Sequence, residues 1–75
     1  MDDLTRDELL VLDVLTEAVS LDEAQIGSRA LLVPSYLKTA LEGLVAKDYV
    51  ITLEKGGQKR YVLNVETAPQ VAMAR

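Results

Sequence analysis

The stretch YVITLEKGGQKRYVLNV, residues 49–65, decides the fold, because its two halves are typical of paired β-strands. YVITL and RYVLNV are rich in β-branched and aromatic residues and follow a period of about two. Between them, Gly56 and Gly57 can take positive φ without strain, as a tight turn requires. We therefore predict an antiparallel hairpin. The residues expected on one face are Tyr61, Leu63 and Val65, with Ile51 and Leu53 as their partners across the pair.

The segment before the hairpin predicts a helix over about 34–47. Pro34 disfavours helical backbone at Val33 and suits the first turn of a new helix. An inner stripe recurs at helical spacing and consists of Leu37, Ala40, Leu41, Leu44 and Val45. The outward face carries Ser35, Lys38, Thr39 and Glu42, with Tyr36 near the entrance.

A shorter helix is expected over about 22–30. Two capping boxes could begin it: Ser20 with Glu23, or Asp22 with Gln25. The second is preferred because it places Leu21 and Ile26 at the positions of a hydrophobic staple. Gly27 lies inside this helix, where glycine costs about 1 kcal/mol relative to alanine. We expect another helix to approach Gly27 closely, where a side chain would not fit.

The first helix is expected over about 6–18. TRDE is a capping box, with Thr5 as N-cap and Glu8 at the third helical position. Its core stripe is predicted to be Leu9, Leu12, Leu15 and Val19. Leu10, Val11 and Val14 widen the apolar band. The widening fits a helix that is buried on two sides, and it equally fits a helix that packs against a second copy of the chain.

Composition excludes several kinds of site. The 75 residues contain no Cys and no His, so disulfides, thiolate or imidazole metal sites and Cys or His catalysis are ruled out. The chain is long enough for one domain, with little room for a catalytic cleft, so we expect neither an enzyme nor a cofactor. No apolar run approaches the roughly 20 residues that span a bilayer. The acidic start, MDDLTRDE, is unlike a targeting signal, so we expect a cytoplasmic protein.

Charge is distributed unevenly along the chain. Residues 1–28 hold eight acidic side chains and one basic one, a net charge of −7. Residues 29–60 hold six basic and three acidic side chains, a net charge of +3, although the whole chain carries −4. Such a change of sign can mark a surface for an anionic partner, and it can equally reflect two solvated faces.

Three helices followed by a hairpin give an order that resembles the winged helix-turn-helix domain. The residues that carry this resemblance are LDEAQIGSRALLVPSYLKTALEGLVAKDYVITLEKGGQKRYVL, from Leu21 to Leu63. They are most similar to the cores of small prokaryotic transcriptional regulators of the MarR, PadR and ArsR kinds. The turn between the second and third helices often holds a glycine in such domains, whereas here it reads Ala30-Leu31-Leu32. The resemblance implies an α+β fold over residues 1–65, with a two-stranded wing. Residues 66–75, ETAPQVAMAR, have no convincing pattern, so we expect a flexible tail there.

The resemblance also implies a function, namely transcription regulation by binding double-stranded DNA. The helix over 34–47 would enter the major groove and the hairpin would contact the backbone. The candidate DNA-binding residues are Arg29, Ser35, Tyr36, Lys38, Thr39, Lys55, Gln58, Lys59 and Arg60. This requires the basic residues of 29–60 to share one side. A homodimer through the first helix would match a two-fold DNA site.

Most of these residues also have a simpler interpretation. Lys55, Lys59 and Arg60 could protect an exposed strand edge from aggregation. Lys38 and Thr39 could be solvated surface, and Tyr36 could fold back on the core. The alternative function is a winged-helix module that binds another protein and does not contact DNA, and the net charge of −4 and the scarcity of arginine facing the groove favour it.

Overall fold

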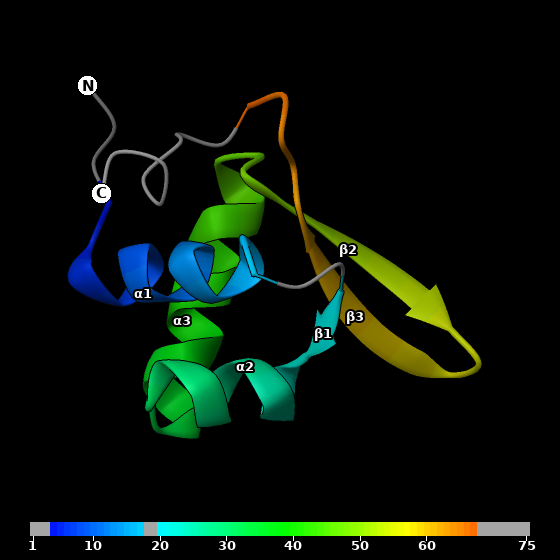
Figure 1. Ribbon diagram of the computed structural model, residues 1–75, viewed down its shortest axis with the longest axis horizontal. Coiled ribbons are helices and arrows are strands. Elements are labelled where there is room, and N and C mark those ends of the chain that lie inside the picture. The colour runs from blue at the N-terminus through cyan, green and yellow to red at the C-terminus, as the bar shows by residue number, and fades with distance from the viewer. Residues whose placement is uncertain (1–3, 18–19, 68–75) are drawn as a thin grey trace.

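The structure is a computed structural model that describes residues 4–17 and 20–67. It has three helices and a three-stranded antiparallel sheet, an α+β arrangement (Figure 1). The elements in chain order are α1 (Arg6–Leu15), β1 (Leu21–Asp22), α2 (Glu23–Ala30), α3 (Pro34–Ala46), β2 (Val50–Lys55) and β3 (Gln58–Leu63). The helices pack together on one side, and the β2–β3 hairpin extends away from them (Figure 1).

The helices begin where the sequence predicts. The capping box of Thr5 and Glu8 is present at α1, and that of Asp22 and Gln25 is present at α2. Pro34 occupies the first turn of α3, as expected. The α1 helix ends at Leu15, earlier than the predicted position 18, and Val19 lies outside the described residues.

One core joins the helices to the sheet. Its fully buried large side chains are Val11, Leu12, Leu15, Ile26, Leu44 and Val50. The expected inner stripe of α3 is confirmed for Leu37, Ala40, Leu41 and Leu44, whereas Val45 is exposed. On α1 the buried stripe is shifted by comparison with the prediction, because Val11 is fully buried and Leu9 is exposed.

The prediction of a two-stranded sheet is incomplete. β1 pairs with β3 through Leu21 opposite Tyr61 and Asp22 opposite Arg60, which gives the strand order β1-β3-β2. Two residues are too short a run to show alternation, so a sequence pattern could not indicate this strand. β3 is therefore the central strand, and Tyr61 is covered by neighbours on both sides.

The predicted register of the hairpin is wrong by one residue. Val50 lies opposite Leu63 and Thr52 lies opposite Tyr61, so these four residues share the face toward the helices. Ile51 and Leu53 point to the other face and are exposed. Val65 follows the end of β3 and is also exposed. A shift of one residue exchanges the two faces of a strand, and the glycine turn alone did not determine which face is buried.

The first residues of the predicted tail make hydrogen bonds to the rest of the domain. Thr67 hydrogen-bonds through its hydroxyl to the backbone carbonyl of Asp48, and its N–H donates to Asn64. The Asn64 side chain donates to the same Asp48 carbonyl at 3.0 Å. Residues 66–67 thus close over the α3–β2 connection, while residues 68–75 lie outside the described part of the chain.

Candidate functional site

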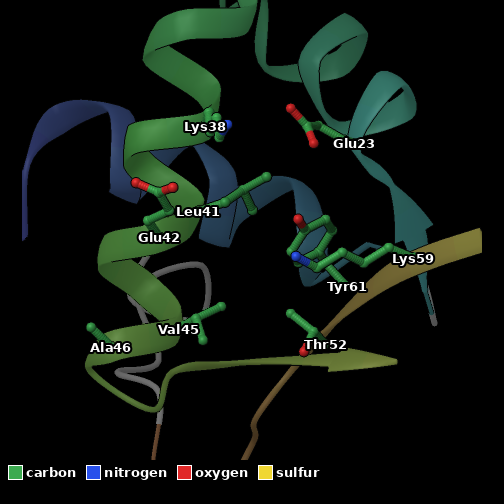
Figure 2. Close-up of a pocket in the computed structure, with 9 residues that line it drawn as sticks. All are labelled: Glu23, Lys38, Leu41, Glu42, Val45, Ala46, Thr52, Lys59 and Tyr61. Atoms are coloured by element: carbon green, nitrogen blue, oxygen red, sulfur yellow. The ribbon is translucent and has the colours of Figure 1, made fainter. Parts of the chain in front are cut away.

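A hollow separates α3 from the hairpin, and its volume is about 370 Å³ (Figure 2). Its walls come from α2, α3, β2 and β3. The lining residues are Glu23, Lys38, Leu41, Glu42, Val45, Ala46, Thr52, Lys59 and Tyr61. Two of the predicted DNA-binding residues, Lys38 and Lys59, are thereby brought to the same place from segments that lie 21 positions apart.

The helical period of α3 sorts its candidate residues onto different sides. Lys38 lies one turn before Leu41 and Glu42, on the side toward the hairpin. Ser35 and Thr39 are exposed, and the Thr39 hydroxyl donates to the Ser35 carbonyl at 3.1 Å. Tyr36 is 62% exposed, so it does not fold back on the core. By its spacing it shares a side with Gly43, which faces α1.

Lys59 and Tyr61 alternate along β3 and share the face toward α3. The Lys59 ammonium lies 5.6 Å from the centroid of the Tyr61 ring, a cation–π contact. Lys59 therefore belongs to the hollow and not to the outer surface of the sheet. It also lies opposite Glu54 across the β2–β3 pair.

The other predicted residues of the hairpin lie on its far face. Lys55, Gln58 and Arg60 line a second hollow together with Ser20, Leu53, Glu54 and Val62. The Arg60 guanidinium donates to Ser20 twice, to the hydroxyl at 3.0 Å and to the backbone carbonyl at 3.1 Å. Arg60 thus fastens β3 to the residue before β1. This structural role was not visible in the sequence, because Ser20 lies 40 positions away.

The basic residues therefore do not form one continuous surface. Lys38 and Lys59 are together, while Lys55 and Arg60 are on the opposite face of the hairpin. Arg29 is exposed near the end of α2 and lines neither hollow. Acidic residues are interleaved with the bases, since Glu23 and Glu42 line the first hollow. The electrostatic attraction toward an anionic partner is correspondingly reduced.

An exposed apolar turn between α2 and α3 was not predicted. Leu31 is 88% exposed and its backbone is left-handed, with φ of 59°. Val33 and Tyr36 beside it are exposed as well. A leucine in this conformation is strained, and glycine would be the ordinary residue. The absence of a glycine from Ala30-Leu31-Leu32 was the sequence feature that could have indicated this strained turn.

Comparison with protein-family models, with curated proteins and with solved structures found no match to this chain. Among the residues that the structure describes, no helix is both long and apolar enough to cross a membrane. The same residues contain no group of three or more acidic side chains placed to hold a metal ion.

Proposed function

We propose that this chain is a winged helix-turn-helix protein that binds double-stranded DNA through α3 and the hairpin. The order of the elements supports the proposal, because a helix pair, α2 and α3, directly precedes a projecting hairpin. In this arrangement α3 would enter the major groove, and the hairpin tip would lie along the phosphate backbone.

The basic residues of 29–60 do not all share one side, so the proposal depends on a smaller set, Lys38 and Lys59, which line the same hollow. A cation on the groove-facing helix and a cation on the hairpin would then contact phosphates on the same side of the protein. Ser35 and Thr39 are exposed on α3 near Lys38, where base edges and sugars would lie. Lys55 and Gln58 adjoin the glycine turn and would add contacts at the tip. Arg60 is engaged with Ser20, and Arg29 does not line the hollow, so neither belongs to the principal contact.

Binding through so few cations is weak and sensitive to salt. Each phosphate contact contributes about −0.9 to the slope of log K against log salt concentration. Lys38 and Lys59 alone would give a slope of roughly −2 per copy. Glu23 and Glu42 oppose the approach of phosphate, so specific binding would use two copies on a two-fold site.

The second copy would pack against α1. Leu9 is exposed on this helix, and Leu10 and Val14 are partly exposed. Val11 is buried in the core and is not available for this contact. Sedimentation equilibrium at high protein concentration tests this dimer. A dimer that Leu9→Ser weakens is the expected result, and a monomer at all concentrations would refute it.

The test of DNA binding is a titration of the ¹⁵N-labelled protein with a mixed-sequence duplex at low salt. The proposal expects chemical-shift changes in α3 around Ser35–Thr39 and at the hairpin tip, which disappear as salt is raised. Unchanged spectra at low salt would reject DNA binding.

A second candidate function is the binding of another protein, and the exposed turn favours it. Leu31, Val33 and Tyr36 are all exposed within six residues of the chain, and a groove lies between α2 and α3. The residues of that groove are Glu23, Ala24, Gly27, Ser28, Leu32, Pro34 and Leu37. The duplex titration separates the two functions, because a protein-binding module would leave the α3 resonances unchanged.

A further inference from the structure

One edge of the sheet lacks the usual protection along most of its length. β2 is an outer strand in the order β1-β3-β2, and its six residues pair with β3 without a bulge (Figure 1). Edge strands of natural proteins usually carry a proline, a bulge or a charged side chain that discourages further pairing. The first four residues of β2, VITL, have none of these, and Lys55 lies at the turn. Lys59 and Arg60 are on the central strand, so they do not protect this edge.

Alternate residues of β2 point their backbone groups away from β3. The Asn64 N–H donates to the Tyr49 carbonyl, which makes these two a hydrogen-bonded pair at the end of the ladder. Because such pairs alternate in an antiparallel ladder, the odd-numbered residues of β2 turn their N–H and C=O toward β3. The even-numbered residues turn theirs outward, and these residues are Val50, Thr52 and Glu54. Within residues 4–17 and 20–67, no hydrogen bond reaches these outward groups.

The same strand exposes two apolar side chains. Ile51 is 41% exposed and Leu53 is 48% exposed, because the helices cover only the other face of the sheet, where Val50 and Tyr61 are buried. Covering both side chains with a neighbouring strand would be favourable. β2 therefore combines an unpaired backbone edge with apolar side chains, the combination that is used when an extended strand adds to a sheet.

We propose that β2 pairs with β2 of a second copy of this chain, antiparallel, about a two-fold axis at Thr52. In this register Thr52 faces the partner's Thr52, and Val50 faces the partner's Glu54. Each facing pair exchanges two backbone hydrogen bonds, so the outward groups of both strands are all used. Ile51 lies beside the partner's Leu53, and the axis repeats this apolar cross-strand pair. The strand is thus complementary to itself.

The charged residues favour this register over its neighbours. The two Glu54 carboxylates lie four positions apart along the strands, about 14 Å, which exceeds the Debye length of about 8 Å in physiological salt. An axis at Leu53 would reduce this separation to about 7 Å. An axis at Ile51 would place Asp48 opposite the partner's Glu54, which sets like charges against each other. Asp48 also lies outside the strand, with a left-handed φ of 67°.

This contact does not depend on DNA binding, and it is separate from the contact proposed for α1. A chain could use both contacts, and β2 pairing would then join one α1 dimer to the next. Because the contact is small, we expect a dissociation constant on the order of 0.1 mM.

The direct test measures amide exchange with water by NMR, without DNA, at about 50 µM and about 1 mM protein. The outward amides of Thr52 and Glu54 should exchange about threefold more slowly at the higher concentration, because more chains are paired. The amide of Gly57 lies in the turn, outside the paired segment, and should exchange equally at both concentrations. Leu9→Ser should leave the slowing in place. Equal exchange of Thr52 and Glu54 at both concentrations would overturn the proposal, whether or not α1 forms a dimer.

Variants test the register by sedimentation equilibrium in the Leu9→Ser background. Leu53→Lys and Ile51→Glu each change an exposed side chain and should each weaken self-association several-fold. Val65→Lys is the matched control, since it changes an exposed apolar residue beyond the end of β3 and should have no effect. An equimolar mixture of Leu53→Lys and Ile51→Glu should associate again, because the register sets the introduced cation beside the introduced carboxylate. A mixture that stays monomeric, or equal weakening by Val65→Lys and Leu53→Lys, would overturn the proposal.

Discussion

Oε1 of Glu8 on α1 lies 2.6 Å from the ammonium of Lys47, which directly follows α3. The same oxygen accepts from the Thr5 backbone N–H at 3.0 Å. Glu8 thus closes the capping box of its own helix and fastens that helix to α3. It is 5% exposed and is the one charged residue that the core of the described chain contains.

This position of Glu8 explains Gly43. A Cβ added at Gly43 would overlap Oε2 of Glu8. Alanine is usually about 1 kcal/mol better than glycine inside a helix. Here Gly43→Ala should instead destabilise the protein, by about 1 kcal/mol, because the Glu8 carboxylate must move away from Lys47 and Thr5.

A double-mutant cycle in urea tests this coupling. Glu8→Ala alone should lower the free energy of unfolding by about 2 kcal/mol, through the loss of the cap and of the ion pair. In the Glu8→Ala background, Gly43→Ala should become stabilising, since the obstacle is gone. Additive effects of the two substitutions would show that the two residues do not oppose each other.

Leu31 should be replaceable by glycine with a gain in stability. Its φ of 59° is unfavourable for leucine by about 1 kcal/mol, and the exposed side chain loses few contacts when it is removed. Part of this gain is offset by the greater freedom of glycine in the unfolded chain. We expect Leu31→Gly to raise the free energy of unfolding by about 0.5 kcal/mol.

Leu31→Ala is the control for this prediction, because alanine keeps the Cβ and with it the strain. Its stability in the same urea experiment should remain near that of the original protein. A loss of stability in Leu31→Gly would mean that the exposed leucine supports the turn, and the strain argument would then be wrong.

The hydroxyl of Tyr61 should contribute little to stability, because it makes no hydrogen bond within the described residues and lines an open hollow. Removing a hydrogen-bonded buried hydroxyl ordinarily costs about 1 kcal/mol or more. Tyr61→Phe should change the free energy of unfolding by less than about 0.5 kcal/mol, whereas Tyr61→Ala should cost several kcal/mol because the ring is buried. Thermal unfolding of both variants gives the comparison. A large loss in Tyr61→Phe would show that the hydroxyl has a partner within the protein.

Local signals in the sequence predicted the helices well. Capping boxes and a proline mark helix starts through contacts within four residues, so Thr5, Asp22 and Pro34 could be interpreted directly. Gly27 was also predicted to be a point of close approach. A Cβ there would lie 3.0 Å from Leu37 Cδ2 on α3.

Features that depend on pairing between distant segments were not predictable in this way. The hairpin register assigned the wrong face to Ile51 and Leu53, because a period of two does not state which face meets the helices. The register decides which basic residues of β3 face the helices, and it places Lys59 on that face together with Tyr61. Lys59 and Arg60 are consecutive in β3 and lie on opposite faces in any register, so their separation was predictable from the strand alone.

The central claim is that Lys38 and Lys59 together contact DNA phosphates. Fluorescence anisotropy of a labelled mixed-sequence duplex, titrated with protein at several salt concentrations, tests it most directly. Lys38→Gln and Lys59→Gln should each weaken binding and make the slope of log K against log salt concentration shallower by about 1. Arg6→Gln removes a positive charge from α1 and should leave the slope unchanged. Equal effects of Arg6→Gln and the two lysine variants, or no binding at low salt, would contradict the claim.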